Sequence, residues 1–405
     1  MSYQKTEKCH SCHETLSDKS VFTLGLIPVV EFPETPEGRG IVAPLYLTEC
    51  PSCKLVQLQH TVDADLLFRD FWYKSGITGS MKHALQDVHD AVVREVNPQL
   101  GDAVLDIGSN DGTLLDMFPV MLLRVGFEPA ENLATEARDK GLVIVPEYFT
   151  REHVYPDWHG RFKAVTAISM FYDLSNPGEF LETVKLVMHP EGVFIVQMNY
   201  LGTMLRDLDV GNIVHEHLAY YSIQAFHKLV VRHGMVLTGV ELNDVNGGSV
   251  RFTVRLGGET PASITEAINK ESLKPWPEFT AGLINMRGAV LMGLTKAEMQ
   301  KKRIAICGAS TRGLALLHFL GRGKDTFAVA GERDPGKWGR FYGATGIPIV
   351  SEAEAREKAD VMLVLPWHFA QEITEREHAW IEAGGELIFP LPEPRIVRRT
   401  GTEKL

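Results

Sequence analysis

The sequence predicts an α/β chain of three structural parts, and three observations support this. Two identical Cys-x-x-Cys pairs lie near the N-terminus. An apolar strand that runs into a glycine-containing turn and a helix occurs at 104–115, and the same order recurs at 301–320. The length of 405 residues is also too great for one hydrophobic core. We therefore expect a small zinc module, a central Rossmann-like domain and a second, C-terminal Rossmann-like domain.

The expected domain boundaries follow changes in composition along the chain. They are 1–70 for the zinc module, 71–260 for the central domain, 261–300 for linking helices and 301–405 for the C-terminal domain. Three prolines, Pro261, Pro275 and Pro277, precede a long run with helical spacing of apolar residues in the linking segment. The polar, basic tail after Pro394 is expected to be loose.

Composition narrows the possible partners. The chain is 44% hydrophobic and 23% charged, as soluble globular proteins are, and no apolar run approaches the ~20 residues of a membrane span. A formal net charge of −11 argues against a nucleic-acid partner. The N-terminus lacks the regions of a secretory signal, so we expect a cytoplasmic protein with reduced thiols. The oligomeric state is not indicated, and a monomer is compatible with the sequence.

The duplicated cysteine pairs predict structural zinc. Cys9, Cys12, Cys50 and Cys53 form two knuckles separated by 37 residues, and each knuckle can supply two thiolates to a tetrahedral ion. Redox use of one pair is the alternative, but no thioredoxin-like context surrounds either pair. Four thiolates leave no open coordination position, so the zinc is expected to support folding and not chemistry.

The turn at 104–115 is the predicted cofactor loop. Asp106 ends an apolar strand, and Gly108 and Gly112 let a ligand lie against bare amides at the start of a helix. Glu128 ends the next strand, about 20 residues on, where such folds bind ribose hydroxyls. Two acids without a phosphate-binding lysine favour S-adenosylmethionine over a nucleoside triphosphate. A tight turn with a purely structural role is the alternative.

Alternating strands and helices continue from this loop and predict a parallel sheet. The carboxyl ends of its strands would bring together Asp106, Glu128, Asn199 and the segment Ser169-Met-Phe-Tyr172. Strands at 235–241 and 250–256, joined through Asn246-Gly-Gly-Ser249, are expected to close the sheet as an antiparallel edge. Before the loop, Tyr73, Ser75 and Ser80 could line the entrance of the cofactor site, or this aromatic segment could simply pack under a loop.

The segment 212–222 holds the densest group of polar side chains, with His215, Glu216, His217, Tyr220 and Tyr221. It is not a zinc-protease motif, because that motif needs a histidine at position 219, which is Ala. Ser222 is expected to cap a helix that ends at Gly234. Two histidines, a glutamate and two tyrosines at the start of a helix suggest acid/base catalysis, although a lone histidine is more often an ordinary core or surface residue.

The second glycine loop, at 308–313, begins the C-terminal unit. It and the following loops carry polar and cationic side chains that should share one rim, namely Ser310, Thr311, Arg312, Arg333, Lys337 and Arg340. This rim would suit an anion or a diphosphate, and a solvated charged edge is the alternative. Cys307, the unpaired thiol, is expected to be inert packing.

With these motifs, the chain resembles the family of nucleotide-linked sugar C-methyltransferases of deoxysugar pathways over nearly its whole length. The shared features are the four-cysteine module, the Asp106-Ile-Gly-Ser-Asn110-Asp111-Gly112 loop, the His-Glu-His motif followed by Tyr-Tyr-Ser, and Gly-Ala-Ser-Thr-Arg-Gly with Asp334-Pro-Gly-Lys337. The resemblance implies a class I methyltransferase domain with His217 as the base and Glu216 as its support. It also implies a sugar nucleotide held between the central and last domains.

The chain departs from this family near the acceptor. Val214 stands where the family has a tyrosine thought to bind the developing enolate, and the segment 170–174 lacks the usual histidine. Asn246 replaces another histidine, and with His215 it is expected to face the acceptor. Tyr172, Tyr220 or Tyr73 would then have to replace the missing phenol.

The leading hypothesis is methyl transfer from S-adenosylmethionine to a carbon beside the keto group of a nucleotide-linked deoxysugar. O-methylation of a sugar hydroxyl or a related small molecule is the nearest alternative. A non-catalytic scaffold with a degenerate methyltransferase core is the third, and the intact Asp106, Glu128 and His217 speak against it.

Overall fold

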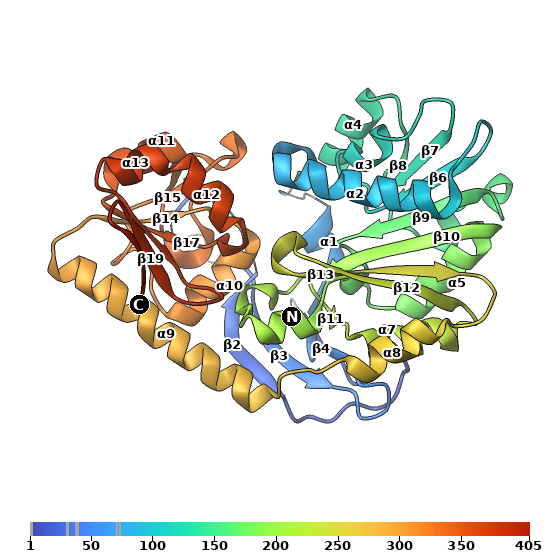
Figure 1. Ribbon diagram of the computed structural model, residues 1–405, viewed down its shortest axis with the longest axis horizontal. Coiled ribbons are helices and arrows are strands. Elements are labelled where there is room, and N and C mark those ends of the chain that lie inside the picture. Colours follow the sequence, from blue (N-terminus) through green and yellow to red (C-terminus); the bar gives the residue numbers. More distant parts are fainter. Residues whose placement is uncertain (1–2, 30–31, 37–39, 70–71, 73) are drawn as a thin grey trace.

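The computed structural model describes residues 3–29, 32–36, 40–69, 72 and 74–405, and its strands gather in three places (Figure 1). The N-terminal strands, in blue, lie at the foot of the molecule, between the central part on the right and the C-terminal part on the left. The predicted α/β fold class with two Rossmann-like sheets is confirmed. The proposed domain boundaries stay a prediction.

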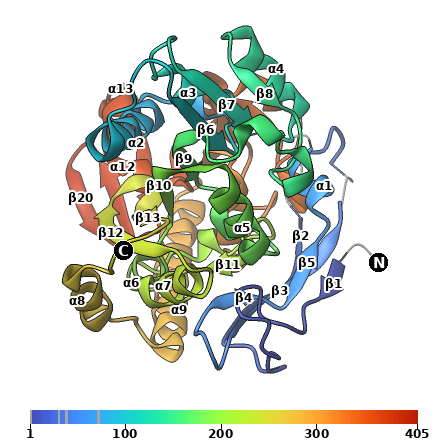
Figure 2. The same cartoon turned by 90° about the vertical axis from the view of Figure 1, so that its right-hand side faces the viewer.

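The N-terminal sheet takes a strand from the central part. Its order is β11-β4-β3-β2, and a separate pair, β1 and β5, lies beside it (Figure 2). The bounds are β1 Tyr3–Lys5, β2 Phe22–Pro28, β3 Val42–Glu49, β4 Val56–Leu58, β5 His60–Val62 and β11 Ala219–Tyr220, with the short helix α1 at Ala64–Phe68. Tyr220 pairs with Val56, and the Leu58 N–H donates to the Leu218 carbonyl at 2.9 Å. The chain just after His217 is therefore held by the cysteine-bearing part.

The central sheet has the order β12-β13-β10-β9-β6-β7-β8. The parallel strands are β6 Ala103–Ile107, β7 Leu123–Phe127, β8 Val143–Val145, β9 Phe162–Ile168 and β10 Met188–Asn199. The antiparallel edge consists of β12 Val236–Asn243 and β13 Ser249–Arg255. The parallel sheet and its antiparallel edge were both predicted from the sequence, whereas the order of the strands was not.

Helices cover both faces of the central sheet, so its strands are apolar on both sides. Val104 belongs to a core with α2, α3 and α4, whereas Leu105 belongs to a core with α5 and α7. The bounds are α2 Gly79–Val96, α3 Thr113–Asp116, α4 Glu131–Asp139, α5 Pro177–Val187, α6 Leu201–Arg206, α7 Ile223–Arg232 and α8 Ala262–Lys270. Ser222 caps α7 as predicted, because its hydroxyl oxygen accepts from the Ala225 N–H at 3.0 Å.

The C-terminal sheet has the order β16-β15-β14-β17-β18-β19-β20. Its strands are β14 Ile304–Cys307, β15 Ala330–Glu332, β16 Ile349–Ser351, β17 Val361–Val364, β18 Glu386–Phe389, β19 Arg395–Arg398 and β20 Gly401–Lys404. Its helices are α9 Trp276–Met299, α10 Thr311–Leu320, α11 Glu352–Lys358, α12 Ala370–Arg376 and α13 His378–Glu382. The expectation of a loose tail was wrong, because β19 pairs with β18 and buries Ile396 against the sheet.

The two large sheets share one arrangement of their parallel strands. In each, the first strand (β6 or β14) lies in the middle, the next two follow on one side and the last two on the other. Ligands of such sheets bind beside the first strand, at the carboxyl ends, where the direction of winding reverses. Among the described residues, no helix has the length and apolarity that a membrane crossing requires.

Candidate active site and metal centre

A cavity of about 860 Å³ opens at the carboxyl ends of β6, β7 and β9, a size typical of small-molecule sites. Six of the predicted site residues contribute to its lining, namely Asp106, Gly108, Asn110, Glu128, Ser169 and Asn246. Ser75 lines it too, as expected for the entrance. Apolar side chains such as Phe127 and Phe180 complete the wall. The cofactor loop thus faces an open space with carboxylates on one side.

Asp106 is a buried carboxyl within this cavity. The Thr166 hydroxyl donates to its Oδ1 at 2.6 Å. Burial is the main cause that raises the pKa of Asp106 to about 7, and the charge of Glu128 adds to it. A perturbed carboxyl in a cavity marks a candidate ligand group.

Glu128 holds the loop in shape. Its Oε2 accepts from the Asn110 N–H at 2.8 Å, and its Oε1 accepts from the Ala130 N–H at 2.9 Å. Burial raises the pKa of this carboxyl, while the two N–H donors oppose the rise. A carboxylate has about four lone-pair sites, so two remain for the hydroxyls of a ribose. The residues present fit S-adenosylmethionine in this respect.

Asp111 and Gly112 belong to the loop motif, but they do not contribute to the cavity lining. Asp111 accepts from the Gly76 N–H at 3.0 Å and from the Thr113 hydroxyl at 2.7 Å. Gly112 has φ +76°, and a Cβ there would lie 2.4 Å from the Leu142 Cδ1. These two residues fasten the loop to its surroundings. Tyr73 lies outside the described residues.

His217 is oriented by the backbone. Its Nδ1 lies 2.8 Å from the Asn212 carbonyl oxygen, which can only accept, so Nδ1 carries the proton and Nε2 carries the lone pair. The Tyr172 ring lies against it, with ring centroids 4.2 Å apart. Burial, and then the charge of Arg312, lower the pKa of His217 to about 3. The ring is therefore neutral at neutral pH.

Glu216, the expected support of His217, makes no direct bond to Nδ1 of that ring, because the Asn212 carbonyl occupies this nitrogen. Its Oε2 is buried and has no hydrogen-bond partner among the described residues, and the same holds for Oδ1 of Asp173. The Tyr220 hydroxyl, whose oxygen the Val214 N–H faces, has no acceptor for its proton there. Burial raises the pKa of Glu216 to about 7. Sequence reasoning missed Asn212 and Asp173 as site residues, although Asp173 follows the predicted strand end and lines the cavity.

His215 has a structural position, contrary to the expectation that it faces the acceptor. It is 1% exposed, and its Nε2–H donates to the Ala43 carbonyl of β3 at 3.1 Å. Burial lowers its pKa to about 4. The residue ties the His-Glu-His segment to the N-terminal sheet.

Two cationic side chains of the predicted C-terminal rim, those of Arg312 and Lys337, bond to other groups of the protein. Arg312 bonds to Asp209 and donates to the Asn246 carbonyl at 2.8 Å. Lys337 is 9% exposed and donates to the Ala309 carbonyl, with Glu332 at 3.5 Å and the Phe32 ring 4.6 Å away. Because Lys337 is buried among these groups, it is not accessible to an anion at the expected site.

Two other residues of the predicted rim differ from Lys337. The Ser310 hydroxyl oxygen accepts from the Gly313 N–H at 3.1 Å and so caps α10. Arg333 is more accessible and pairs with Glu372 at 2.9 Å. Ser80, at the start of α2, also donates to Glu372, at 2.5 Å. This contact places Arg333 where the central and C-terminal parts meet.

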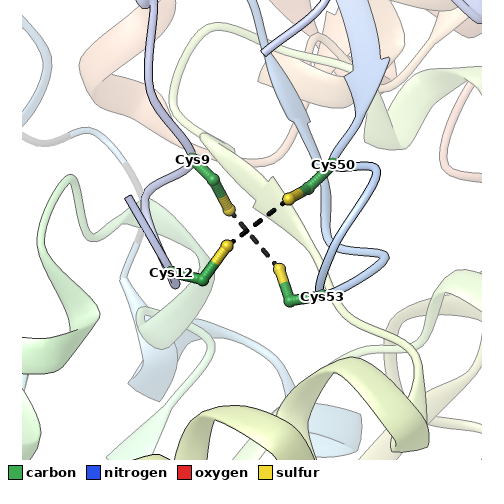
Figure 3. A group of neighbouring side chains, drawn as sticks. All are labelled: Cys9, Cys12, Cys50 and Cys53. Atoms are coloured by element: carbon green, nitrogen blue, oxygen red, sulfur yellow. Dashed lines mark hydrogen bonds between the residues drawn. The ribbon is translucent and has the colours of Figure 1, made fainter. Parts of the chain in front are cut away.

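The four N-terminal cysteines converge (Figure 3). Their Sγ atoms lie within 4.8 Å of one another, with Cys9 to Cys53 at 3.5 Å and Cys12 to Cys50 at 3.4 Å. Both knuckles fold alike, because the residues after them, His13 and Lys54, have positive φ and donate back to the first cysteine carbonyl. Four sulfurs at these separations suit a tetrahedral ion with Zn–S bonds of about 2.3 Å.

Comparison with known proteins gives matches over most of the chain. A family model described as a methyltransferase domain matches residues 80–239, and one described as a C-methyltransferase C-terminal domain matches residues 244–392. The C-methyltransferase NovU of Streptomyces niveus is 30% identical over 382 residues, which cover 91% of each chain. A ubiquinone biosynthesis O-methyltransferase of Caulobacter vibrioides is 28% identical over 126 residues, 30% of this chain and 49% of that protein.

Among solved structures, a geranyl diphosphate C-methyltransferase from Streptomyces coelicolor has a TM-score of 0.36 at 8% identity. The match covers 45% of this chain and 84% of that chain. A likeness at this level carries no argument about activity.

Proposed function

Because the chain belongs to the family of S-adenosylmethionine-dependent C-methyltransferases, we propose that it methylates a carbon beside the keto group of a nucleotide-linked deoxysugar. S-adenosylmethionine supplies an electrophilic methyl group when bound. The chain's own residues must bind that donor, hold the acceptor and remove a proton from the acceptor carbon. The observation that carries the proposal is the orientation of His217.

His217 acts as the base through Nε2. The Asn212 carbonyl fixes the proton on Nδ1, so the lone pair of Nε2 is available at every pH at which the ring is neutral. A pKa of about 3 makes the imidazole a weak base in the ligand-free protein. As the proton moves, negative charge appears on the acceptor beside the new imidazolium, and this opposite charge favours the protonated ring.

The cofactor occupies the cavity beside β6 in this proposal. Glu128 accepts hydrogen bonds from the ribose hydroxyls with the lone pairs that its two backbone bonds leave. Asp106, Gly108 and Ser169 line the same cavity. We further propose that the cysteine cluster holds structural zinc, which has no open position for chemistry.

We propose that the acceptor's diphosphate binds at Arg333 and not at Lys337. The Arg333 side chain is 39% exposed and lies where the two large parts meet. The side chain of its partner Glu372 is 33% exposed. Ion pairs that are open to solvent are weak enough for a phosphate to replace the carboxylate. Lys337 would first have to leave a buried position.

The test is to incubate the protein with a methyl-¹³C donor and a panel of nucleoside-diphosphate-linked keto-deoxysugars. Nuclear magnetic resonance of the product distinguishes a methyl group on carbon from one on oxygen. The proposal expects a new carbon-bound methyl beside the ketone in at least one panel member. A methyl ether as the product would instead support O-methylation.

A further inference from the structure

Three polar groups near His217 are buried with hydrogen bonds left to make in the described part of the chain. Oδ1 of Asp173 and Oε2 of Glu216 have no partner, and the Tyr220 hydroxyl, whose oxygen the Val214 N–H faces, has no acceptor for its proton. Tyr220 is 3% exposed and Glu216 is 9% exposed. An unsatisfied buried polar group costs about 1–3 kcal/mol. Such a group of atoms is best explained if something outside the protein completes their hydrogen bonds.

Two neighbouring residues connect this group of atoms with the cavity and with the base. Asp173 ends the 3₁₀ turn η4 (Phe171–Asp173), which follows β9, and it lines the cavity. Its neighbour Tyr172 lies against the ring of His217. Tyr220 comes from β11 and is close enough for the charges of Asp173 and Glu216 to affect its pKa. The cluster therefore reaches the cavity through Asp173 and the base through Tyr172.

The two carboxyls cannot both be ionised at low energetic cost. Burial, and then the charge of Glu216, raise the pKa of Asp173 well above its usual range. Like charges in an apolar site keep at least one acid protonated. A neutral carboxylic acid has an O–H to donate, which an ionised carboxylate does not.

We propose that Asp173, as a neutral carboxylic acid, and the Tyr220 hydroxyl donate hydrogen bonds to the oxygen of the enolate that His217 generates. The proposal rests on the carbon methylation proposed above. It assigns a donor pair to the place where Val214 supplies no phenol. Preorganised donors aimed at a developing oxyanion are among the strongest contributions to catalysis, and a carboxylic acid kept neutral by an apolar site can be one of them.

The electron flow balances without a further reactant. Nε2 of His217 takes the proton, the C–H electron pair becomes the C=C bond, and the carbonyl π pair moves onto oxygen. The oxygen then accepts hydrogen bonds from Asp173 and Tyr220, which keep their protons. When the carbon takes the methyl group, the ketone reforms and the methyl–sulfur bond breaks with its pair on sulfur.

The test measures, in heavy water and without methyl donor, how fast the proton beside the keto group exchanges for deuterium. The substrate is the nucleotide-linked keto-deoxysugar of the panel for which the wild-type protein gives the fastest exchange. Asp173→Ala should slow exchange by about 10²–10³-fold, the usual cost of one oxyanion donor. Asp173→Asn keeps an N–H donor and should be faster than the Ala variant. Neither variant should lower the melting temperature or the S-adenosylmethionine affinity, since Oδ1 of Asp173 has no hydrogen-bond partner among the described residues.

Tyr220 has a matched control in its neighbour. Tyr221 also has a buried hydroxyl without a partner among the described residues, but it packs in a different core. Tyr220→Phe should slow exchange by about 10²-fold, and Tyr221→Phe should not change it.

Wild-type exchange rates in Asp173→Ala would overturn the inference and leave the proposed function intact. A loss of exchange matched by a loss of stability or of cofactor affinity would also overturn it, because Asp173 would then be structural or a cofactor ligand. Absence of exchange in the wild type across the whole panel would reject the proposed function, and this inference with it.

Discussion

The two glycine loops of this chain have the same local geometry, and only the central one faces the candidate cofactor cavity. Gly108 and Gly308 each follow the first strand of a parallel sheet with positive φ, +70° and +87°. Glu128 and Glu332 end the next strand, and each accepts from a loop N–H, that of Asn110 at 2.8 Å and that of Ala309 at 3.1 Å.

The difference lies in what stands beside each loop. A Cβ on Gly308 would lie 2.6 Å from the Pro366 ring, so a rigid residue occupies that crevice. The flexible side chain of Met170 is the neighbour of Gly108. Two residues before the glycines, the central strand carries the acid Asp106, and the C-terminal strand carries the buried Ile306. The loop motif alone therefore specifies a backbone shape, and its neighbours decide whether a ligand can enter.

The largest expected effect concerns the cysteine cluster, which supports the central crevice through the pairing of β4 with β11. Cys50→Ser should lose the metal and the fold of the N-terminal sheet, since structural zinc in small domains contributes about 10–16 kcal/mol of folding free energy. Metal content and melting temperature are the measurements. Cys307→Ala, which lies outside the cluster, should keep the metal. A metal-free wild type with an unchanged melting temperature would refute this.

The second prediction concerns the buried acid Asp106, whose counterpart in the C-terminal strand, Ile306, carries no charge. The folded-state pKa of Asp106, about 7, lies above its usual 3.8, so its stabilising protonation is complete below pH 4 and is lost as pH rises through 7. Ligand-free wild type should therefore lose up to about 4 kcal/mol between pH 4 and pH 8 from this group.

Asp106→Asn should reduce this pH dependence and raise the free energy of unfolding at pH 8. Denaturant unfolding at each pH is the measurement, and the other buried acids with a raised pKa, Asp173, Asp209 and Glu216, are present in both proteins. Identical pH profiles in the variant and the wild type would show that Asp106 does not carry the effect.

The third prediction concerns the paired acids. Glu332→Ala should lower stability by about 3 kcal/mol, because it leaves the buried Lys337 without its carboxylate, and should leave cofactor affinity unchanged. Glu128→Ala should weaken S-adenosylmethionine binding tenfold to a hundredfold, the value of hydrogen bonds to a charged group. Calorimetry and thermal unfolding of both variants provide the comparison. Equal cofactor affinity in the two variants would contradict the assignment of the cavity.

The smallest effect is expected at the rim of the C-terminal part. Arg333→Ala should raise the acceptor KM several-fold at low salt, and the difference should shrink as salt screens the charge. Arg399→Ala removes an equally charged but more exposed side chain and serves as the control. A salt-independent KM that is the same in both variants would exclude Arg333 from acceptor binding.

Sequence reasoning was sufficient for the parts of the structure that depend on local pattern. The parallel sheet, its antiparallel edge and the convergence of the cysteines follow from periodicity, turn residues and spacing. It was insufficient where distant residues decide. The burial of Lys337 depends on Phe32 and Glu332, and the position of His215 depends on a bond to Ala43 in another sheet. The two-residue strand β11 was missed because only its pairing with β4 defines it.

The central claim is that His217, which lies against Tyr172 near the candidate cofactor cavity, removes a proton from the acceptor carbon. The most direct test is proton exchange of nucleotide-linked keto-deoxysugars in heavy water without methyl donor. Wild type should incorporate deuterium beside the keto group, and His217→Ala should slow this by about 10²–10⁴-fold, the usual contribution of a placed base. Exchange at the wild-type rate in His217→Ala, or methylation of oxygen without any exchange in the wild type, would contradict the claim.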